Sequence, residues 1–190
     1  MTEMPGRLES LSRTPRWLGP VYVAPSAVVL GEVILGEEVS LWPHTVLRAD
    51  LNRIVVGRGT NLQDCCVLHL SEDRPCEVGS HVTVGHGAIL HACRVEDECL
   101  IGMRATVLDG AVIGSQSIVG AGAVVKEGFQ VPPGSLVVGV PARVVRSLTE
   151  TERAGLRARA LEYIELARAH AARGYLQLWN PPPVPLPSVA

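Results

Sequence analysis

The sequence has few aromatic residues, no excess of basic residues and no long apolar run. Only 4% of its 190 residues are Phe, Trp or Tyr, so the core cannot be built from large rings. Lys and Arg number 17 against 19 Asp and Glu, which disfavours a nucleic-acid partner because phosphate backbones demand a basic excess. No stretch approaches the roughly 18 apolar residues of a membrane span, so we expect no membrane partner.

The beginning of the chain and its cysteine content indicate a cellular location. The first 20 residues contain no apolar run long enough for the hydrophobic region of a signal peptide, so we expect a cytoplasmic protein. Five cysteines are an odd number, and reduced thiols are expected in that compartment rather than disulfides. The length suits one globular domain with a short appendage.

Within blocks of the sequence, aliphatic residues recur at every sixth position, as at Leu35, Leu41 and Leu47, and short insertions separate the blocks. The other members of the series are Val56, Leu62, Leu68, Val78, Val84, Leu90, Ile101, Val107, Ile113, Val119, Val125, Val131 and Val137. A period of six fits neither a helix nor an ordinary strand. It is typical of an all-β solenoid of hexapeptide repeats, in which each aliphatic side chain fills the interior and a short strand forms one wall. The alternative is a chance distribution of Val and Gly in a β-sandwich.

The repeat predicts that two histidines stack. Three hexads make one triangular coil, so equivalent corners recur after three aliphatic positions. Counting from Leu68 gives Leu90, and the residues that follow these two are His69 and His91. Neighbouring coils lie about 4.8 Å apart, whereas two nitrogens that bind one zinc ion are at most about 4 Å apart. A slight convergence of the two rings would therefore let both bind one ion.

His86 follows Val84 by two positions and falls on a different corner. About five residues of extended chain, roughly 16 Å, separate it from His91. If all three histidines bind one metal ion, His86 must come from another copy of the chain. Three-fold packing of triangular prisms would give a homotrimer with three identical sites. The alternative is three satisfied or exposed histidines without a ligand.

Further polar residues fall on the same two corners. Arg48 is expected beneath His69, whereas Asp64 is expected beneath His86, with Gln63 beside it. Polar residues also cap solenoid corners for solubility alone. We interpret the joint pattern as a functional site.

Three segments resemble the signature blocks of the γ-class carbonic anhydrases: LRADLNRIVVGRGTNLQDCCVLH, VTVGHGAILHAC and IGMRATVLDGAVIG. The likeness runs from about Val21 to Val145 and continues through the predicted C-terminal helix. It implies a left-handed parallel β-helix, which is an exception to the usual right-handed crossover. It also implies a homotrimer with metal between the subunits.

The resemblance implies that His69 and His91 of one chain and His86 of its neighbour ligate Zn²⁺, or Fe²⁺ as in some relatives. Three neutral imidazoles leave an open position, where bound water ionises at a pKa of about 7, a value taken from carbonic anhydrase itself. The predicted function is the reversible hydration of CO2 to bicarbonate and a proton by a metal-bound hydroxide at the subunit interface.

Other residues match the family beside the metal. Arg48 and Asp50 match an ion pair at the subunit interface. Gln63 matches the residue that hydrogen-bonds metal-bound water, and Asp64 matches an orienting acid. The apolar Leu51 would help to form a dry pocket for CO2.

The sequence departs from the family pattern at two places. Ala49 stands where relatives commonly have glycine. Alanine can keep the same backbone bend if the φ angle of this residue is negative. Leu51 stands where the well-studied active member has a glutamate, and that member's long acidic loop shrinks here to LSEDRPCE. Glu72 or Asp73 could replace the missing proton shuttle, although carboxylates in a surface turn are ordinary. We therefore expect slow turnover.

After the repeats, an α-helix is predicted. Thr149 and Glu152 make a capping box, and Gly174 suits the C′ position. An apolar stripe that would pack on a prism wall or a neighbouring subunit consists of Leu156, Ala160, Ile164 and Ala167. Tyr163 matches a tyrosine that relatives bring near the metal, although packing alone would also explain it.

The sequence thus divides into four parts. They are an N-terminal segment (1–20), the β-helix (21–146), the C-terminal α-helix (147–175) and a Pro-rich tail (176–190). The last ten residues contain five prolines and are expected to be extended.

The other histidines, His44, His81 and His170, lack the stacked relation and are interpreted as structural or solvated. Cys93 lies near His91 but farther along the strand from the corner. That position disfavours the cysteine as a fourth ligand.

Two other functions stay open. Hexapeptide solenoids also serve as acyltransferases, in which one histidine acts as a base between subunits and a CoA thioester supplies the acyl group. Three histidines at metal spacing disfavour this class, because such a transferase needs only one. The third possibility is a metal-binding assembly subunit without significant turnover.

Overall fold

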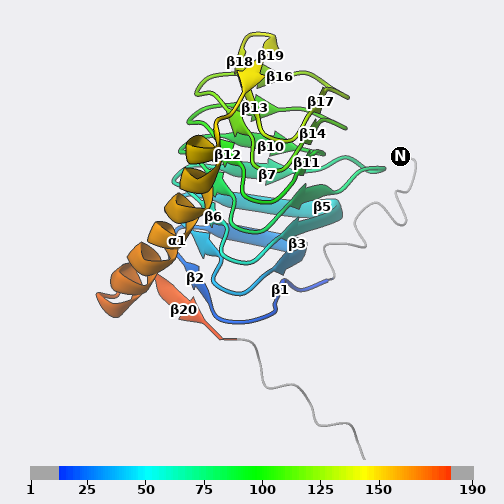
Figure 1. Cartoon of the computed structure of the whole chain (residues 1–190). Coiled ribbons are helices and arrows are strands. Elements are labelled where there is room, and N and C mark those ends of the chain that lie inside the picture. The colour runs from blue at the N-terminus through cyan, green and yellow to red at the C-terminus, as the bar shows by residue number, and fades with distance from the viewer. Residues whose placement is uncertain (1–12, 181–190) are drawn as a thin grey trace, which may run out of the picture.

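The chain coils into a left-handed parallel β-helix, described here for residues 13–180 of a computed structural model. Within that range it forms 20 β-strands and one α-helix. The strands stack in about seven turns, with α1 alongside (Figure 1). The predicted fold class is confirmed.

Each turn contributes one short strand to each of three walls. The first wall contains the first halves of β3 (Val28–Leu35) and β5 (Val46–Val56), with β7 (Val67–His69), β10 (Ile89–His91), β13 (Thr106–Val107) and β16 (Val124–Val125). The second wall contains the second halves of β3 and β5, with β1 (Arg16–Trp17), β8 (Cys76–Val78), β11 (Arg94–Val95), β14 (Val112–Ile113) and β17 (Gln130–Val131). β5 bends around the corner between these walls, because its first half pairs with β7 and its second half with β8.

The helix wall is the third wall and carries α1. Its parallel strands are β2 (Val21–Val23), β4 (Ser40–Leu41), β6 (Asn61–Leu62), β9 (Thr83–Val84), β12 (Leu100–Ile101), β15 (Ile118–Val119) and β18 (Ser135–Gly139). Two antiparallel strands close its ends: β19 (Ala142–Ser147) beside β18, and β20 (Gln177–Trp179) beside β2.

The six-residue period accounts for the core. Every aliphatic position that it predicts is at most 3% exposed. Leu47, Leu68 and Leu90 lie in register on successive coils. Because full burial of such a side chain stabilises a fold by about 1.5 to 3 kcal/mol, these columns hold the coils together.

Corner glycines let neighbouring coils approach. A Cβ added to Gly102 would lie 2.4 Å from the backbone nitrogen of Ala121, which a side chain cannot tolerate. Gly87 follows His86 with a φ of 69°, in the left-handed region where glycine carries no steric penalty. Cys65 and Arg104 adopt the same left-handed conformation at this corner of the neighbouring coils, so Gly87 is the member of this column that does so without steric cost.

The helix α1 (Glu150–Ala172) runs back along the helix wall from the β19 end toward β2 (Figure 1). The Thr149 hydroxyl accepts a hydrogen bond from the Glu152 backbone N–H at 3.2 Å, and the Glu152 carboxylate accepts one from the Thr149 N–H at 2.8 Å. This capping box and the position of Gly174 after the C-cap Arg173 confirm the predicted helix ends. The predicted apolar stripe is buried. No helix in residues 13–180 is long and apolar enough to cross a membrane.

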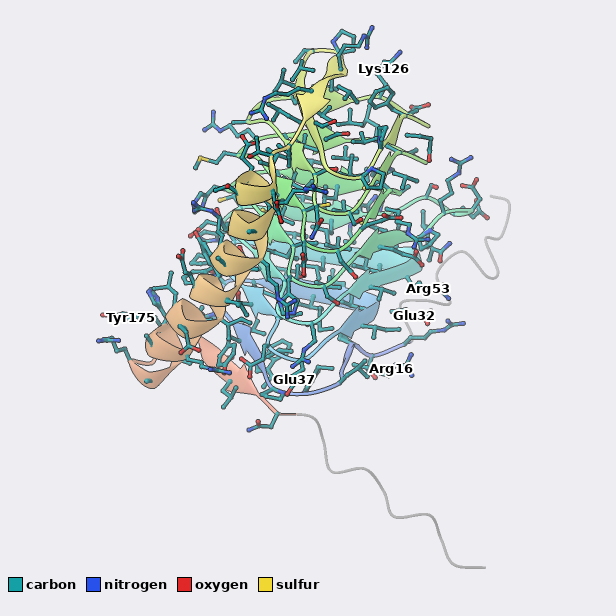
Figure 2. All side chains as sticks on the ribbon, in the orientation of Figure 1. Arg16, Glu32, Glu37, Arg53, Lys126 and Tyr175 are labelled. Carbon is teal, nitrogen blue, oxygen red and sulfur yellow. The ribbon has the colours of Figure 1, made fainter. Side chains whose placement is uncertain are left out.

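Trp17 and Trp179 pack together near one end of the solenoid, with ring centroids 5.2 Å apart. Figure 2 shows Glu37 near this end and Lys126 at the other. The segment predicted as a tail begins with the strand β20, whereas the extended conformation predicted for its last ten residues falls outside residues 13–180.

Candidate metal centre

His69 and His91 end β7 and β10 at the corner where the first wall turns into the second. The strand register pairs the two residues directly, which confirms the predicted stacking. His69 Nδ1 lies 3.1 Å from His91 Nε2. Two nitrogens that bind one tetrahedral zinc ion at about 2.0 to 2.1 Å lie about 3.4 Å apart. The two rings therefore present nitrogens at nearly the separation that one ion requires.

A carboxylate engages the other nitrogen of each ring. Asp50 Oδ1 lies 2.9 Å from His69 Nε2, and Asp109 Oδ1 lies 2.5 Å from His91 Nδ1. Histidines that ligate metals almost always donate their second N–H to such a partner, which fixes the tautomer and the ring orientation. The two nitrogens left over are the pair that face each other.

Asp50 also forms an ion pair with Arg48 of the same chain. Burial alone would raise the pKa of Asp50, but hydrogen bonds with His69 and Arg48 outweigh it and lower the pKa below its ordinary value. Asp50 is therefore an ionised acceptor for His69. Arg48 lies one coil from His69, as predicted from the repeat.

Asp109 was not among the residues predicted from the sequence. It follows Val107 by two positions, on the coil next to His91. Asp64 has the same relation to the aliphatic series and was predicted. The sequence therefore contained a signal that could have identified Asp109. It is a carboxylate that lies two residues after an aliphatic position, on the coil that follows a predicted ligand.

His86 lies in the turn between β9 and β10, at the other edge of the first wall. Its Nδ1 is 2.8 Å from Asp64 Oδ2, which confirms the predicted stacking and leaves Nε2 available. Each of the three predicted ligands thus has one nitrogen against a carboxylate and one nitrogen free of it.

The structure does not bring these three histidines together within one chain. In residues 13–180, no three His, Cys, Asp or Glu side chains form a group that could hold a metal ion. His86 stands before β10, whereas His91 ends that strand. The outer surface of the same wall includes three apolar side chains that are at least 41% exposed: Val28, Leu30 and Ile89. An exposed apolar face between two parts of a site is typical of a surface that another protein chain covers.

Gln63 lies beside the His86 corner and is only 5% exposed. Its Nε2 is 3.4 Å from Asn61 Oδ1, a long contact that holds the amide weakly. The Gln63 amide therefore makes no strong hydrogen bond within residues 13–180. Leu51, the predicted apolar residue, is partly buried and packs against the core.

Tyr163 projects from α1 toward the same corner. Its ring packs edge-on against Trp42, with centroids 5.7 Å apart. Burial raises the pKa of Tyr163, the charge of Arg159 lowers it and the charge of Asp64 raises it, with a net increase. Tyr163 thus carries a neutral hydroxyl within electrostatic range of Asp64.

The turn after β7 holds the two carboxylates that the sequence offers as proton shuttles. Asp73 accepts hydrogen bonds from Ser71 Oγ at 2.8 Å and Arg74 Nε at 3.3 Å. The Ser71 bond is the main cause that lowers the pKa of Asp73, which makes this carboxylate a weaker base. Glu72 is exposed in the same turn.

Two of the remaining histidines, His44 and His170, are solvated and structural as predicted, whereas the Nδ1 of His81 is buried without a hydrogen-bond partner in residues 13–180. His44 is exposed at a corner, and His170 packs edge-on against Trp42 at 5.0 Å. Cys93 is buried, and its hydrogen bond with Cys76, together with burial, raises the pKa of the Cys93 thiol well above its usual value. A neutral thiol in the core is a poor metal ligand.

This fold and site define a hexapeptide-repeat protein with a candidate metal centre. Residues 92–127 match the family model "Bacterial transferase hexapeptide (six repeats)". "Probable carbonic anhydrase" of Methanocaldococcus jannaschii is 47% identical, over 77% of this chain and 92% of its own length. "Gamma carbonic anhydrase 1, mitochondrial" of Arabidopsis thaliana is 45% identical over 80% of this chain, which spans 57% of that relative. The chain belongs to the γ-carbonic anhydrase family of hexapeptide-repeat proteins.

Among solved structures, that of a putative acetyltransferase from Bacillus cereus matches with a TM-score of 0.82 and 36% identity. The match covers 85% of this chain and 94% of that one. The likeness thus extends over most of the chain.

Proposed function

We propose that this protein catalyses the reversible hydration of CO2 to bicarbonate and a proton at a divalent metal ion shared between chains of a homotrimer. His69 and His91 of one chain and His86 of a neighbouring chain would hold the ion. One observation carries the proposal: each of these imidazoles has a carboxylate on one nitrogen, and the free nitrogens of His69 and His91 lie 3.1 Å apart.

The donor set fits zinc. Zinc sites that perform catalysis commonly have three protein ligands and one open position. When bound, such an ion supplies a nucleophile at neutral pH by lowering the pKa of water to about 7. Fe²⁺ is the alternative metal, because imidazole suits both ions.

The chain's own residues would orient the reactants. Asp50, Asp64 and Asp109 hold one tautomer and one ring orientation at each histidine. The weakly held Gln63 amide would donate a hydrogen bond to an oxygen of the substrate. Leu51 would help to exclude water from the site of a small apolar substrate.

Proton release would limit the rate. Leu51 cannot carry a proton, and Asp73 is a weakened base. Glu72 is therefore the proposed shuttle, from an exposed turn three residues beyond the end of β7. A single surface carboxylate would release protons more slowly than a dedicated relay.

The homotrimer would form through the first wall. That wall carries one part of the site at each edge and exposed apolar side chains on its outer surface. In a closed three-fold assembly, the His86 of every chain would meet the His69 and His91 of a neighbouring chain. The cytoplasmic location stays a prediction.

Elemental analysis, sedimentation and stopped-flow assays test this proposal. The purified protein should be a trimer with about one divalent ion per chain, and its zinc or iron form should hydrate CO2. The variant His86→Ala should lose the metal, whereas His44→Asn, which alters an exposed histidine at a comparable corner, should keep it. A metal-free monomer would refute the proposal.

Acyl transfer from a CoA thioester is the second candidate. The similarity to a putative acetyltransferase and the transferase description of the matched repeats favour it. Three carboxylate-backed imidazoles are more than one catalytic base requires, which favours the metal. If neither metal form hydrates CO2 above background at any buffer concentration, binding of a CoA thioester would decide between acyl transfer and a subunit without turnover.

A further inference from the structure

A groove of about 270 Å³ lies on the helix wall beside the His86 corner. Its lining includes Gln63 and Gly85 from the coils of the candidate site, and Arg159 from α1. Its apolar lining residues are Leu100, Ile101, Met103, Ile118, Val119 and Ala121. The groove is therefore mainly apolar and carries one cation.

The groove is larger than a bicarbonate ion needs. A water molecule takes about 30 Å³ of liquid, so the groove has room for about nine waters. Bicarbonate has four heavy atoms and would fill less than half of it. The space suits a ligand with a hydrocarbon tail.

Arg159 is the charged group of this groove. Among residues 13–180 it forms no hydrogen bond or ion pair, whereas Arg157 and Arg168 of the same helix pair with Glu98 and Glu38. The positive charge of Arg159 acts on Tyr163: it lowers the pKa of Tyr163, whereas burial raises that pKa by more. An unpaired guanidinium above an apolar floor fits a carboxylate, which arginine binds through two parallel hydrogen bonds.

We propose that this groove binds a small organic monocarboxylate, with the carboxylate on Arg159 and a short apolar tail over Leu100, Ile118 and Met103. The apolar lining disfavours a second charge on the ligand, because a buried charge without a partner is costly. The site goes beyond the proposed hydration reaction and needs no metal. A ligand in it would also contact Gln63.

Titration calorimetry on the full-length protein, with metal removed and with metal restored, tests the proposal with butyrate as the probe. Butyrate should bind about tenfold more tightly than acetate, because it buries two further methylene groups. Butylammonium, which has a similar tail and the opposite charge, should not bind.

Three variants locate the ligand. Arg159→Met keeps an apolar stem, removes the charge and should weaken butyrate binding about tenfold. Arg153→Met removes an exposed arginine of the same helix that does not line the groove, and should leave binding unchanged. Met103→Ala, at a side chain that is 58% exposed, should reduce the preference for butyrate over acetate.

Equal binding of butyrate and acetate, or unchanged butyrate binding by Arg159→Met, would overturn the proposal. A loss of trimer by Arg159→Met in sedimentation would also overturn it, because another copy of the chain would then cover the groove. Butyrate binding by the metal-free protein is independent of turnover, so this test and that of CO2 hydration can fail separately.

Discussion

A metal site shared between chains can be tested by mixing variants that each lack one part of it. We predict that His69→Ala and His86→Ala each abolish metal binding when purified alone. The first variant keeps an intact His86, and the second keeps an intact His69 and His91. When the two are unfolded together and refolded with zinc, an intact pair from one chain can meet an intact His86 from the other.

The expected recovery follows from the arrangement of ligands. At each interface one chain contributes His69 and His91, and the next chain contributes His86. In an equal mixture, the chain on each side is the suitable variant about half of the time. About one quarter of the interfaces are therefore complete, and the refolded trimers should hold about one quarter of the wild-type zinc.

Elemental analysis of the sedimenting trimer measures this fraction. A mixture of His69→Ala with His91→Ala is the matched control, because both changes fall on the same side of the interface and no mixed interface is complete. Equal zinc in the two mixtures, or no zinc in either, would refute a site that combines His86 of one chain with the other two histidines of its neighbour.

The remaining predictions concern single residues and turnover. Asp109→Asn should weaken metal binding about 10- to 100-fold, because His91 loses its carboxylate partner; unchanged affinity in a chelator competition would contradict this role. Raising the concentration of an imidazole-type buffer in stopped-flow assays should raise kcat with little effect on kcat/KM, because the soluble base replaces a slow proton shuttle. A kcat that does not change with buffer concentration would show that proton release does not limit the rate. Burial and the charges of Arg157 and Arg58 lower the pKa of His81, so the contribution of neutral His81 to stability should be complete above about pH 6.5 and decline below it, because the unfolded chain binds the proton first. Denaturant unfolding across this range should show a smaller decline for His81→Gln, and an equal decline would contradict the assignment. Thr149→Ala should lower the free energy of unfolding by about 1 kcal/mol through loss of the cap, as measured against the wild type in urea, and an unchanged value would contradict it.

The repeat in the sequence predicts the core and the stacked histidines because a solenoid converts spacing along the chain into position in space. Each six-residue step adds one strand, so residues one coil apart can be counted directly. His69 and His91, and likewise Asp64 and His86, were placed correctly in this way. The cap of α1 was also predictable, because its hydrogen bonds join residues only three apart.

Other features depend on contacts that the spacing does not encode. The wall that α1 covers is set by side-chain packing, as where Tyr163 meets Trp42. The pairing of β20 with β2 joins the two ends of the described chain, and no local pattern predicts it. The position of Asp109 could also be counted along the repeat. Its role, however, became visible only when the direction of the His91 ring was known.

The two antiparallel strands at the ends of the helix wall determine how the molecule can grow. A parallel stack leaves a row of unpaired backbone groups at each end, onto which another stack could add. β19 and β20 occupy those positions on the helix wall, in an orientation that interrupts the parallel series. Axial addition of another parallel stack at the helix wall is thereby disfavoured. The described chain thus closes its own repeat at both ends of the helix wall.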